Sequence, residues 1–191
     1  MAARDNRKRD HINVICPSTV CELKGQDILV QAIKSMDAGL RGKCKFVFLG
    51  ELRNDNAKEY QMIETLAKEY QNVELHPLVE REKLLELYYD MDVVVAPSRE
   101  DATPATIVEG LMYHKICIGS SGTGVSRYLK DGWDGFVFEN ANADDLRNKL
   151  EYMVREFAEL GELRERGRKV YETIYSYDIF AVSYTHLTLP T

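Results

Sequence analysis

The sequence lacks the features that mark several large classes of protein. No apolar run approaches the roughly 18 residues that a membrane span requires, and the N-terminus has no signal-peptide apolar segment. Basic residues are in the minority, because 25 Lys and Arg stand against 31 Asp and Glu, for a net charge of −6. A broad nucleic-acid surface needs the opposite excess to neutralise phosphates. We therefore expect a cytoplasmic globular protein that spans no membrane and binds no nucleic acid.

Three motifs that carry well-known chemistry are also missing. The chain has no G-x-x-x-x-G-K-[ST] loop, which argues against a P-loop nucleotidase. No G-x-G-x-x-G follows the first apolar run, which weakens an NAD-binding interpretation. No G-x-S-x-G elbow is present, so hydrolase chemistry has no candidate nucleophile.

Cysteine and histidine are scarce, at four residues each. The cysteines contain no C-x-x-C pair, and three of them lie in or beside apolar, strand-like runs. Reduced thiols in a cytosolic protein explain them more simply than disulfides or zinc. The histidines are scattered without metal-ligand spacing, so we expect neither a metal nor another cofactor. The cysteines are Cys16, Cys21, Cys44 and Cys117.

What the sequence does contain is a regular alternation of short apolar runs with longer amphipathic stretches. Three consecutive valines at 93–95 are typical of a strand covered on both faces, whereas apolar residues of 25–36 recur at helical spacing. This β-α alternation predicts an α/β domain with a mainly parallel sheet of about six strands and helices on both faces. The expected strands are 12–16, 45–50, 72–78, 92–98, 115–120 and 135–139. The expected helices are 25–36, 56–70, 80–91, 103–113, 124–132, 142–158 and 160–175, with Thr103 as the N-cap of the fourth.

The two ends of the chain depart from this pattern. Residues 1–10 include the basic stretch "RDNRKRD", and we expect them to be a solvated leader or linker remnant. Residues 182–191, "VSYTHLTLPT", resemble translated vector sequence, and we expect them to be a non-native tail. The domain then covers 11–181.

Ligands of parallel sheets bind at the carboxyl ends of the strands, and two loops expected there suit an anion. Lys24 stands next to Gly25 at a helix start, where unpaired N–H groups and a full positive charge suit a diphosphate. On spacing alone, a solvated lysine is the slightly simpler explanation. The glycines of 119–125 are able to bring N–H groups close to phosphate oxygens, but such loops often only connect elements.

A third loop carries acids instead. The stretch "PSREDATPATIVEGLM" at 97–112 places Asp101 just ahead of a helix and Glu109 about a turn and a half inside it. Two acids repel a phosphate, but they accept hydrogen bonds from hydroxyls, so the stretch suits a sugar or a ribose. Alternatively, Asp101 favours the helix N-terminus electrostatically and Glu109 is solvated. The spacing alone leaves these two interpretations even.

Three stretches together resemble the family 4, or group 1, glycosyltransferases of GT-B fold. "LKGQDILVQAI" is similar to the family's K-G-x-D-x-L-[IV]-x-A helix start. "VVVAPSREDATPATIVEGLM" is similar to its segment of P-S and two glutamates, with Asp101 in the place of the first acid and Glu109 in that of the second. "SSGTGVSRYLKDGWDGFVFE" is similar to its G-G-x-x-E followed by D-G-x-x-G. The order and spacing match over about residues 11–180, which implies the Rossmann-like C-terminal half of a GT-B fold.

The resemblance also implies roles for individual residues. It implies a nucleotide-sugar donor, transfer with retention at the anomeric carbon, and no metal. Lys24 would contact the donor diphosphate, Glu109 the ribose hydroxyls, and Asp101 would lie near the transferred sugar, which makes the two acids the candidate catalytic residues. Backbone near Leu78 and Val79 would contact the base. The remaining donor-binding candidates are Ser18, Thr19, Gly25, Thr106, Ile107, Gly122, Thr123 and Gly124.

The chain departs from the family pattern at several places. Thr19 stands where the family often has a second phosphate-binding arginine, and Ser18 where it commonly has a glycine. Thr123 and Arg127 replace the first glycine and the glutamate of G-G-x-x-E. Donor-phosphate binding therefore rests more heavily on Lys24 and on helix dipoles.

A GT-B enzyme works in the cleft between two domains, and the acceptor-binding N-terminal domain is absent from this sequence. We therefore expect the donor half of a hexosyltransferase that acts on a glycan, lipid or other acceptor. This half alone transfers nothing, and any peripheral membrane association belongs to the missing half. Two alternatives stay open. One is a non-catalytic nucleotide-sugar-binding or interaction module, which Thr19 and Arg127 favour, and the other is half of a sugar-nucleotide epimerase, whose acid pattern fits less well.

Overall fold

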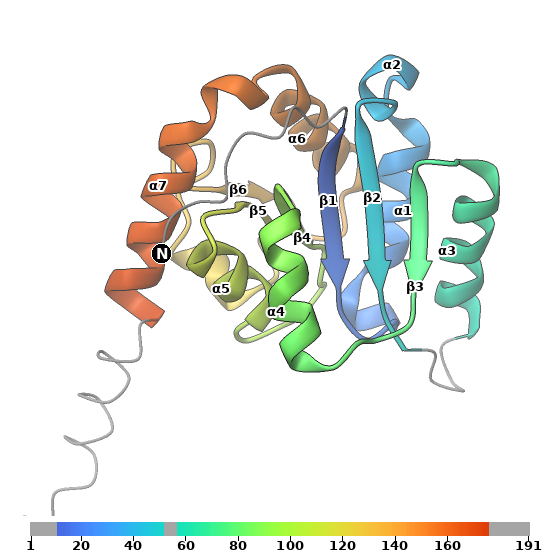
Figure 1. Cartoon of the computed structure of the whole chain (residues 1–191), viewed down its shortest axis with the longest axis horizontal. Coiled ribbons are helices and arrows are strands. Elements are labelled where there is room, and N and C mark those ends of the chain that lie inside the picture. Colours follow the sequence, from blue (N-terminus) through green and yellow to red (C-terminus); the bar gives the residue numbers. More distant parts are fainter. Residues whose placement is uncertain (1–10, 52–56, 176–191) are drawn as a thin grey trace, which may run out of the picture.

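Six strands form one sheet in the computed structural model, which describes residues 11–51 and 57–175 (Figure 1). The strands are β1 (Ile12–Pro17), β2 (Cys44–Leu49), β3 (Val73–His76), β4 (Val93–Ala96), β5 (Ile116–Ser120) and β6 (Phe136–Phe138). Their order across the sheet is β3-β2-β1-β4-β5-β6, and every neighbouring pair is parallel. The predicted Rossmann-like α/β fold with a six-stranded parallel sheet is confirmed.

Helices cover both faces of this sheet. The α-helices are α1 (Gln26–Ser35), α2 (Ala38–Arg41), α3 (Ala57–Glu69), α4 (Arg81–Asp90), α5 (Ala105–Met112), α6 (Ala143–Arg155) and α7 (Gly161–Val170). The shorter turns are η1 (Glu22–Lys24), η2 (Gly124–Arg127), η3 (Phe157–Glu159) and the single π turn η4 (Tyr171–Tyr175). In Figure 1, α4 and α5 lie in front of the sheet, α1 and α3 lie behind it, and α7 runs along one edge. Because α1 and α5 cover opposite faces, the chain leaves β1 and β4 in opposite directions.

Alternate strand residues face two separate hydrophobic cores. In β4, Val93 and Val95 belong to the core under α1, α3 and α6, whereas Val94 and Ala96 belong to the core under α4 and α5. All four are buried. Burial on both faces explains why β4 is a continuous apolar run rather than an alternating one.

The structure corrects two local predictions. Thr103 is not an N-cap, because α5 begins at Ala105 and Pro104 occupies the cap position in an extended conformation, with φ −64° and ψ 105°. The φ of Pro104 is compatible with a helix, but its ψ is extended, so Ala105 is the first residue with helical geometry. The helix predicted over 124–132 is only the 3₁₀ turn η2. The backbone beyond it closes a tight turn instead, in which the N–H of Gly132 donates to the carbonyl of Gly135.

The four cysteines are all free thiols. Burial raises the pKa of Cys16 and of Cys44 to about 12 in each case, and it raises the pKa of Cys117 as well. Cys21 differs from these three, since it is only partly buried and lies in the loop between β1 and α1.

Gly110 is the point of closest approach between α5 and the sheet. A Cβ placed on this residue would lie 2.7 Å from Sγ of Cys117 and 3.0 Å from Cγ2 of Val94, which is closer than packed side chains allow. The missing side chain therefore lets α5 lie close against β4 and β5. This close packing also fixes the position of the neighbouring Glu109 relative to the sheet.

We predict that Gly110→Ala lowers the free energy of unfolding by about 1–3 kcal/mol, because overpacking outweighs the gain in helix propensity. Gly161→Ala is the matched control, since nothing lies within 4 Å of a Cβ at that position of α7. It is expected to leave stability unchanged or raise it by up to about 1 kcal/mol. Urea denaturation of both variants tests this, and equal effects of the two substitutions would show that Gly110 is not a packing contact.

Candidate functional site

A cavity of about 230 Å³ lies between the carboxyl ends of β1 and β4. These two strands are neighbours at the point where the strand order reverses, which is where open α/β sheets bind ligands. Its walls come from the loop after β1 and from the loop that joins β4 to α5. Sequence-predicted residues in these walls are Ser18, Thr19, Lys24, Asp101 and Thr106.

The loop after β1 is held in shape by a buried glutamine. The side-chain amide of Gln26 donates to Oγ of Ser18 at 2.7 Å and to the carbonyl of Thr19 at 3.0 Å. Gly25 just before it has φ +67°, and a Cβ there would lie 2.1 Å from the carbonyl oxygen of Pro97. Only glycine fits this position, because it combines a left-handed backbone with a close approach of another chain segment.

Lys24 and Asp101 meet across the mouth of the cavity. The Nζ of Lys24 lies 2.5 Å from Oδ2 of Asp101, and the two side chains are 33% and 16% exposed. Oδ1 of Asp101 accepts a hydrogen bond from the N–H of Thr103 at 3.2 Å. The structure therefore brings the predicted phosphate-binding lysine and the first predicted acid into direct contact, as one ion pair.

Arg99 fastens these two loops together. Its guanidinium makes two hydrogen bonds to the carboxylate of Asp27, at 2.8 and 2.6 Å, and a third to the carbonyl of Glu22 at 2.6 Å. Its backbone N–H donates to the carbonyl of Leu23 at 2.8 Å. Partial burial opposes ionisation of Asp27, but the hydrogen bonds from Arg99 and its charge lower the pKa of that carboxyl below its usual value. This clamp sets the separation of Lys24 from Asp101.

The glycine-rich loop after β5 packs against the same acidic loop. A Cβ on Gly124 would lie 1.9 Å from the carbonyl oxygen of Ala102, and one on Gly122 would lie 2.2 Å from that of Arg99. The N–H groups of 122, 123 and 124 already donate within the protein, to Oγ of Ser120, to the carbonyl of Ser120 and to the carbonyl of Asp101. These glycines thus serve loop packing, and phosphate binding at this loop remains a prediction.

Glu109 is not among the residues that line the cavity, but it lies one helical turn along α5 from Thr106, which does line it. Thr106 and Glu109 share a face of α5 because they are three residues apart. Glu109 is 7% exposed, and its Oε1 lies 2.8 Å from Nη1 of Arg81, the first residue of α4. The structure does not bring Glu109 into contact with Lys24 or Asp101, and its ribose-binding role remains a prediction.

Tyr88 lies beside Glu109 and is fully buried. Its ring stacks on that of Tyr113, with centroids 5.6 Å apart. Burial, followed by the nearby charge of Glu109, raises the pKa of Tyr88. The carboxylate of Glu109 also interacts with the Tyr88 hydroxyl, but this hydroxyl does not reach the geometry of a hydrogen bond with any residue that the structure describes.

The other predicted donor-binding residues lie around this region with different exposures. Leu78 is 49% exposed after β3, and Val79 is partly buried against the core under α4. Ile107 is fully buried in that same core, so only its backbone can reach a ligand. Thr123 is buried, with its hydroxyl bonded to the carbonyl of Ser120.

Sequence reasoning did not identify four residues that organise the site. Gln26 and Arg99 could have been predicted from the sequence, because each is a polar residue within a stretch that the sequence analysis had singled out as a candidate ligand-binding segment. Asn140 and Arg81 gave no signal in the sequence, because their partners are distant in sequence. Asn140 bonds to Ser120 and to the carbonyl of Arg99, and Arg81 pairs with Glu109.

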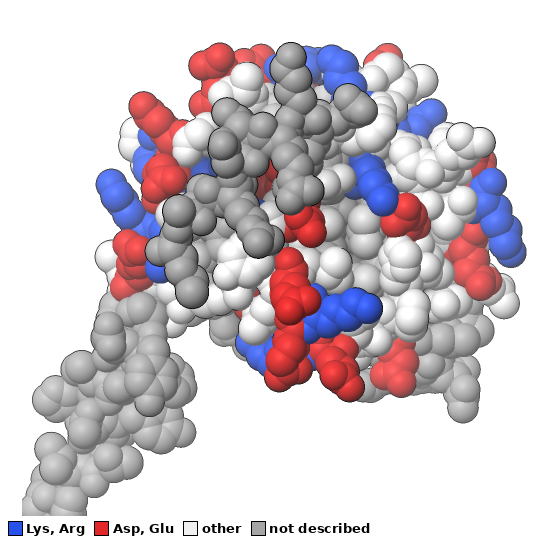
Figure 2. Space-filling view, viewed as in Figure 1, with Lys and Arg blue, Asp and Glu red and all other residues white. Residues whose placement is uncertain are grey.

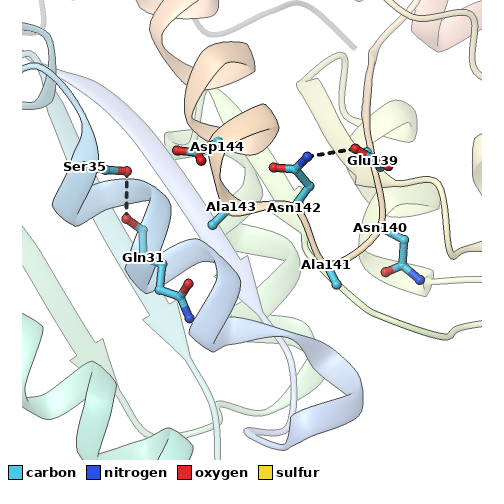
Figure 3. Close-up of a pocket in the computed structure, with 8 residues that line it drawn as sticks. All are labelled: Gln31, Ser35, Glu139, Asn140, Ala141, Asn142, Ala143 and Asp144. Atoms are coloured by element: carbon cyan, nitrogen blue, oxygen red, sulfur yellow. Dashed lines mark hydrogen bonds between the residues drawn. The ribbon is translucent and has the colours of Figure 1, made fainter.

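A second, larger hollow lies between α1 and the loop that leads from β6 into α6 (Figure 3). It has a volume of about 540 Å³ and is lined by polar side chains such as Gln31 and Asn140. Figure 3 shows Ser35 bonded to the backbone of Gln31 and Asn142 bonded to Glu139, so these groups are already engaged. No predicted site residue lies in this hollow.

The surface over α4 carries charges of both signs, and Figure 2 shows acidic and basic side chains next to one another there.

No described helix is long and apolar enough to cross a membrane. Within 11–51 and 57–175, no group of three or more His, Cys, Asp or Glu residues is placed to hold a metal ion.

Comparison with known proteins places these features in a family. The sequence profile described as "Glycosyl transferases group 1" matches residues 3–170. An uncharacterized glycosyltransferase of Methanocaldococcus jannaschii is 26% identical over 148 residues, which are 76% of this chain and 39% of that protein. The chain therefore spans well under half the length of this curated relative.

Solved structures share the fold at low sequence identity. Sucrose-phosphate synthase from Thermosynechococcus elongatus superposes with a TM-score of 0.81 at 21% identity, over 93% of this chain and 45% of its own. HepE from Anabaena, in complex with UDP, superposes with a TM-score of 0.79 at 18% identity, over 94% of this chain and 50% of its own. The C-terminal domain of a glycosyl transferase group 1 family protein from Francisella tularensis gives 0.76 at 13% identity, over 87% of each chain.

We predict that Asp27→Asn lowers the free energy of unfolding by about 1–2 kcal/mol at pH 7, because it breaks the charge-assisted pair with Arg99. The pKa of Asp27 is lower in the folded than in the unfolded protein, so the pair stabilises the wild type above about pH 4. That advantage is lost as the pH falls through the folded pKa. Urea denaturation of wild type and variant at pH 3, 4, 5 and 7 measures it, and a difference that does not shrink in acid would contradict the assignment.

Proposed function

The chain belongs to the group 1 glycosyl transferases, and we propose that its described part is the donor-binding domain of a retaining, family 4 hexosyltransferase. The donor is a nucleotide sugar, bound in the cavity between β1 and β4. The acceptor is a glycan, a lipid or another hydroxyl compound, held by a second domain. Catalysis uses no metal, and the enzyme acts in the cytoplasm.

One observation carries this proposal: a lysine and an acid from separate loops line the same cavity at the switch point of the sheet. A diphosphate that enters the cavity competes with Asp101 for Lys24, because both are anions. Lys24 then neutralises charge on the diphosphate, which is also where negative charge develops as the sugar leaves. Asp101, released from Lys24, can accept hydrogen bonds from sugar hydroxyls.

Glu109 lies one helical turn along α5 from the cavity wall at Thr106. A carboxylate accepts two hydrogen bonds at once, which suits the adjacent hydroxyls of a ribose. Its position on the same face of α5 as Thr106 supports the order of diphosphate at Lys24 and nucleoside toward Glu109.

Relatives of the same fold support the class of donor. HepE from Anabaena has been crystallised with UDP, with UDP and glucose, and with UDP-glucose. A nucleoside diphosphate sugar is therefore the first ligand class to test, with UDP, GDP and ADP as the nucleotides.

A binding module that transfers no sugar is the second candidate. Arg127, which stands where the family has a glutamate, is exposed on η2 and is not among the residues that line the cavity. Donor binding without any hydrolysis or transfer of the sugar, in the presence of the acceptor domain of a relative, would favour this candidate.

We predict that calorimetry detects binding of at least one UDP-, GDP- or ADP-sugar, and that Lys24→Met and Glu109→Ala each weaken it about tenfold or more. Each variant removes a hydrogen bond to a charged group, worth about 1.5–3 kcal/mol.

Matched controls separate these losses from general effects of charge. Lys34→Met removes a lysine near the C-terminal end of α1, the helix that follows Lys24, where it pairs with Glu69. Glu151→Ala removes a part-buried glutamate that pairs with Arg155 on α6. Both controls are expected to bind like wild type. Absence of binding to any of these sugars at millimolar concentration would overturn the proposal for this chain.

A further inference from the structure

We propose that Tyr88 is a positioning residue, whose hydroxyl donates a hydrogen bond to Glu109 when a nucleotide ribose replaces Arg81 at that carboxylate. This inference rests on the proposed function, because it assumes that Glu109 binds the ribose. It adds a residue for which the sequence motifs give no role in donor binding.

The Tyr88 hydroxyl is an exception among buried polar groups. Buried hydroxyls are nearly always hydrogen-bonded, since an unpaired one loses its bonds to water without replacement. Tyr88 is 0% exposed, and its hydroxyl has no hydrogen-bond partner among residues 11–51 and 57–175. A phenylalanine would fill the same space without the free-energy cost of burying an unpaired hydroxyl. We therefore infer that the hydroxyl has a hydrogen-bond partner in another state of the protein.

Glu109 is the acid beside this hydroxyl. Arg81 and Tyr88 share one face of α4, and the facing side of α5 carries Glu109, which pairs with Arg81, and Tyr113, which stacks on Tyr88. The charge of Glu109 and an interaction of its carboxylate with the Tyr88 hydroxyl both help to raise the pKa of Tyr88, although the two groups do not reach the geometry of a hydrogen bond. The Tyr88 ring is held by stacking on Tyr113, which leaves the hydroxyl little freedom to move. The carboxylate is the more mobile partner, because a glutamate side chain turns about three bonds. A small rotation of Glu109 therefore completes the hydrogen bond.

Arg81 holds Glu109 in its present orientation. The pair joins Oε1 of Glu109 to Nη1 of Arg81 at 2.8 Å, and the arginine side chain is 66% exposed. An exposed arginine loses little when it exchanges a carboxylate for water. Ribose hydroxyls that reach Glu109 can thus displace Arg81, and Tyr88 then supplies the donor that fixes the carboxylate from its buried side.

The test measures how strongly each protein distinguishes a nucleoside diphosphate from its 2′-deoxy form. Calorimetry is carried out with UDP, GDP or ADP, whichever binds most tightly, on wild type and on Tyr88→Phe. We expect wild type to bind the 2′-deoxy form about tenfold more weakly, and Tyr88→Phe to show a ratio of about threefold or less. The same ratio in both proteins would overturn the positioning role.

Tyr89→Phe is the matched control. It removes a hydroxyl from the adjacent residue of α4, whose ring meets Tyr113 edge-on and is 49% exposed. This variant is expected to keep the wild-type ratio. Thermal unfolding of Tyr88→Phe without nucleotide adds a second readout, and we expect its Tm to equal or exceed that of wild type by up to about 4 °C. A lower Tm would show that the hydroxyl has a structural partner and would overturn the inference.

Failure of this inference is distinguishable from failure of the proposed function. If wild type binds none of the three nucleotides, or if Glu109→Ala binds them as wild type does, the assignment of the ribose site itself is wrong. If both of those tests succeed and the 2′-deoxy ratio is the same in wild type and Tyr88→Phe, only the role of Tyr88 is wrong.

The proposed replacement of Arg81 by ribose hydroxyls at Glu109 leads to a separate prediction. Arg81→Ala frees Glu109 before the nucleotide arrives, so we expect the same affinity as wild type or up to about threefold tighter binding of the nucleoside diphosphate. Binding weakened tenfold or more would show that Arg81 contacts the ligand rather than yielding to it, and it would overturn the exchange.

Discussion

The parallel pairing of β1 with β4 in the middle of the sheet is the constraint on which the candidate site depends. The two strands point the same way, but the chain leaves β1 for α1 on one face and leaves β4 for α5 on the other. Their outgoing loops must diverge, and a cavity forms between them. The clamp from Arg99 to Asp27 and the glycines of the loop after β5 then limit how far the loops separate. The cavity is thus a product of topology, and local side chains set its width.

Polar groups at this site are paired with one another within the protein. Lys24 is bonded to Asp101, Glu109 to Arg81, and the N–H groups of 122, 123 and 124 to backbone or side-chain oxygens. Under the proposed function, ligand binding is an exchange of partners, in which each new contact replaces an old one. The net free energy of such an exchange is smaller than the sum of the new contacts suggests. This pairing also stabilises the loops that form the site, since unpaired charges in partly buried positions are costly.

The sequence predicted the fold well because its signals are periodic and local. Three valines in a row identify β4, and the helical spacing of 25–36 identifies α1 to within a residue at each end. Predictions failed where one residue decides the outcome, as at Pro104, which delays the start of α5 beyond Thr103. The site was predicted in part: Lys24 and Asp101 share a cavity, but their direct contact was not foreseen. Arg81 and Tyr88 could not be found at all, because their relation to Glu109 arises only when α4 and α5 pack on the same face of the sheet.

The uneven burial of the four thiols has a practical consequence. Three of them are enclosed and, with a raised pKa, are poor nucleophiles in the folded state. Cys21 alone is part-exposed, and it lies in the segment that also provides Thr19 and Lys24. A maleimide fluorophore added to the native chain reacts there first, without any engineering of the sequence. The dye then reports from the rim of the cavity, so that occupancy can be followed by fluorescence at concentrations far below those calorimetry requires.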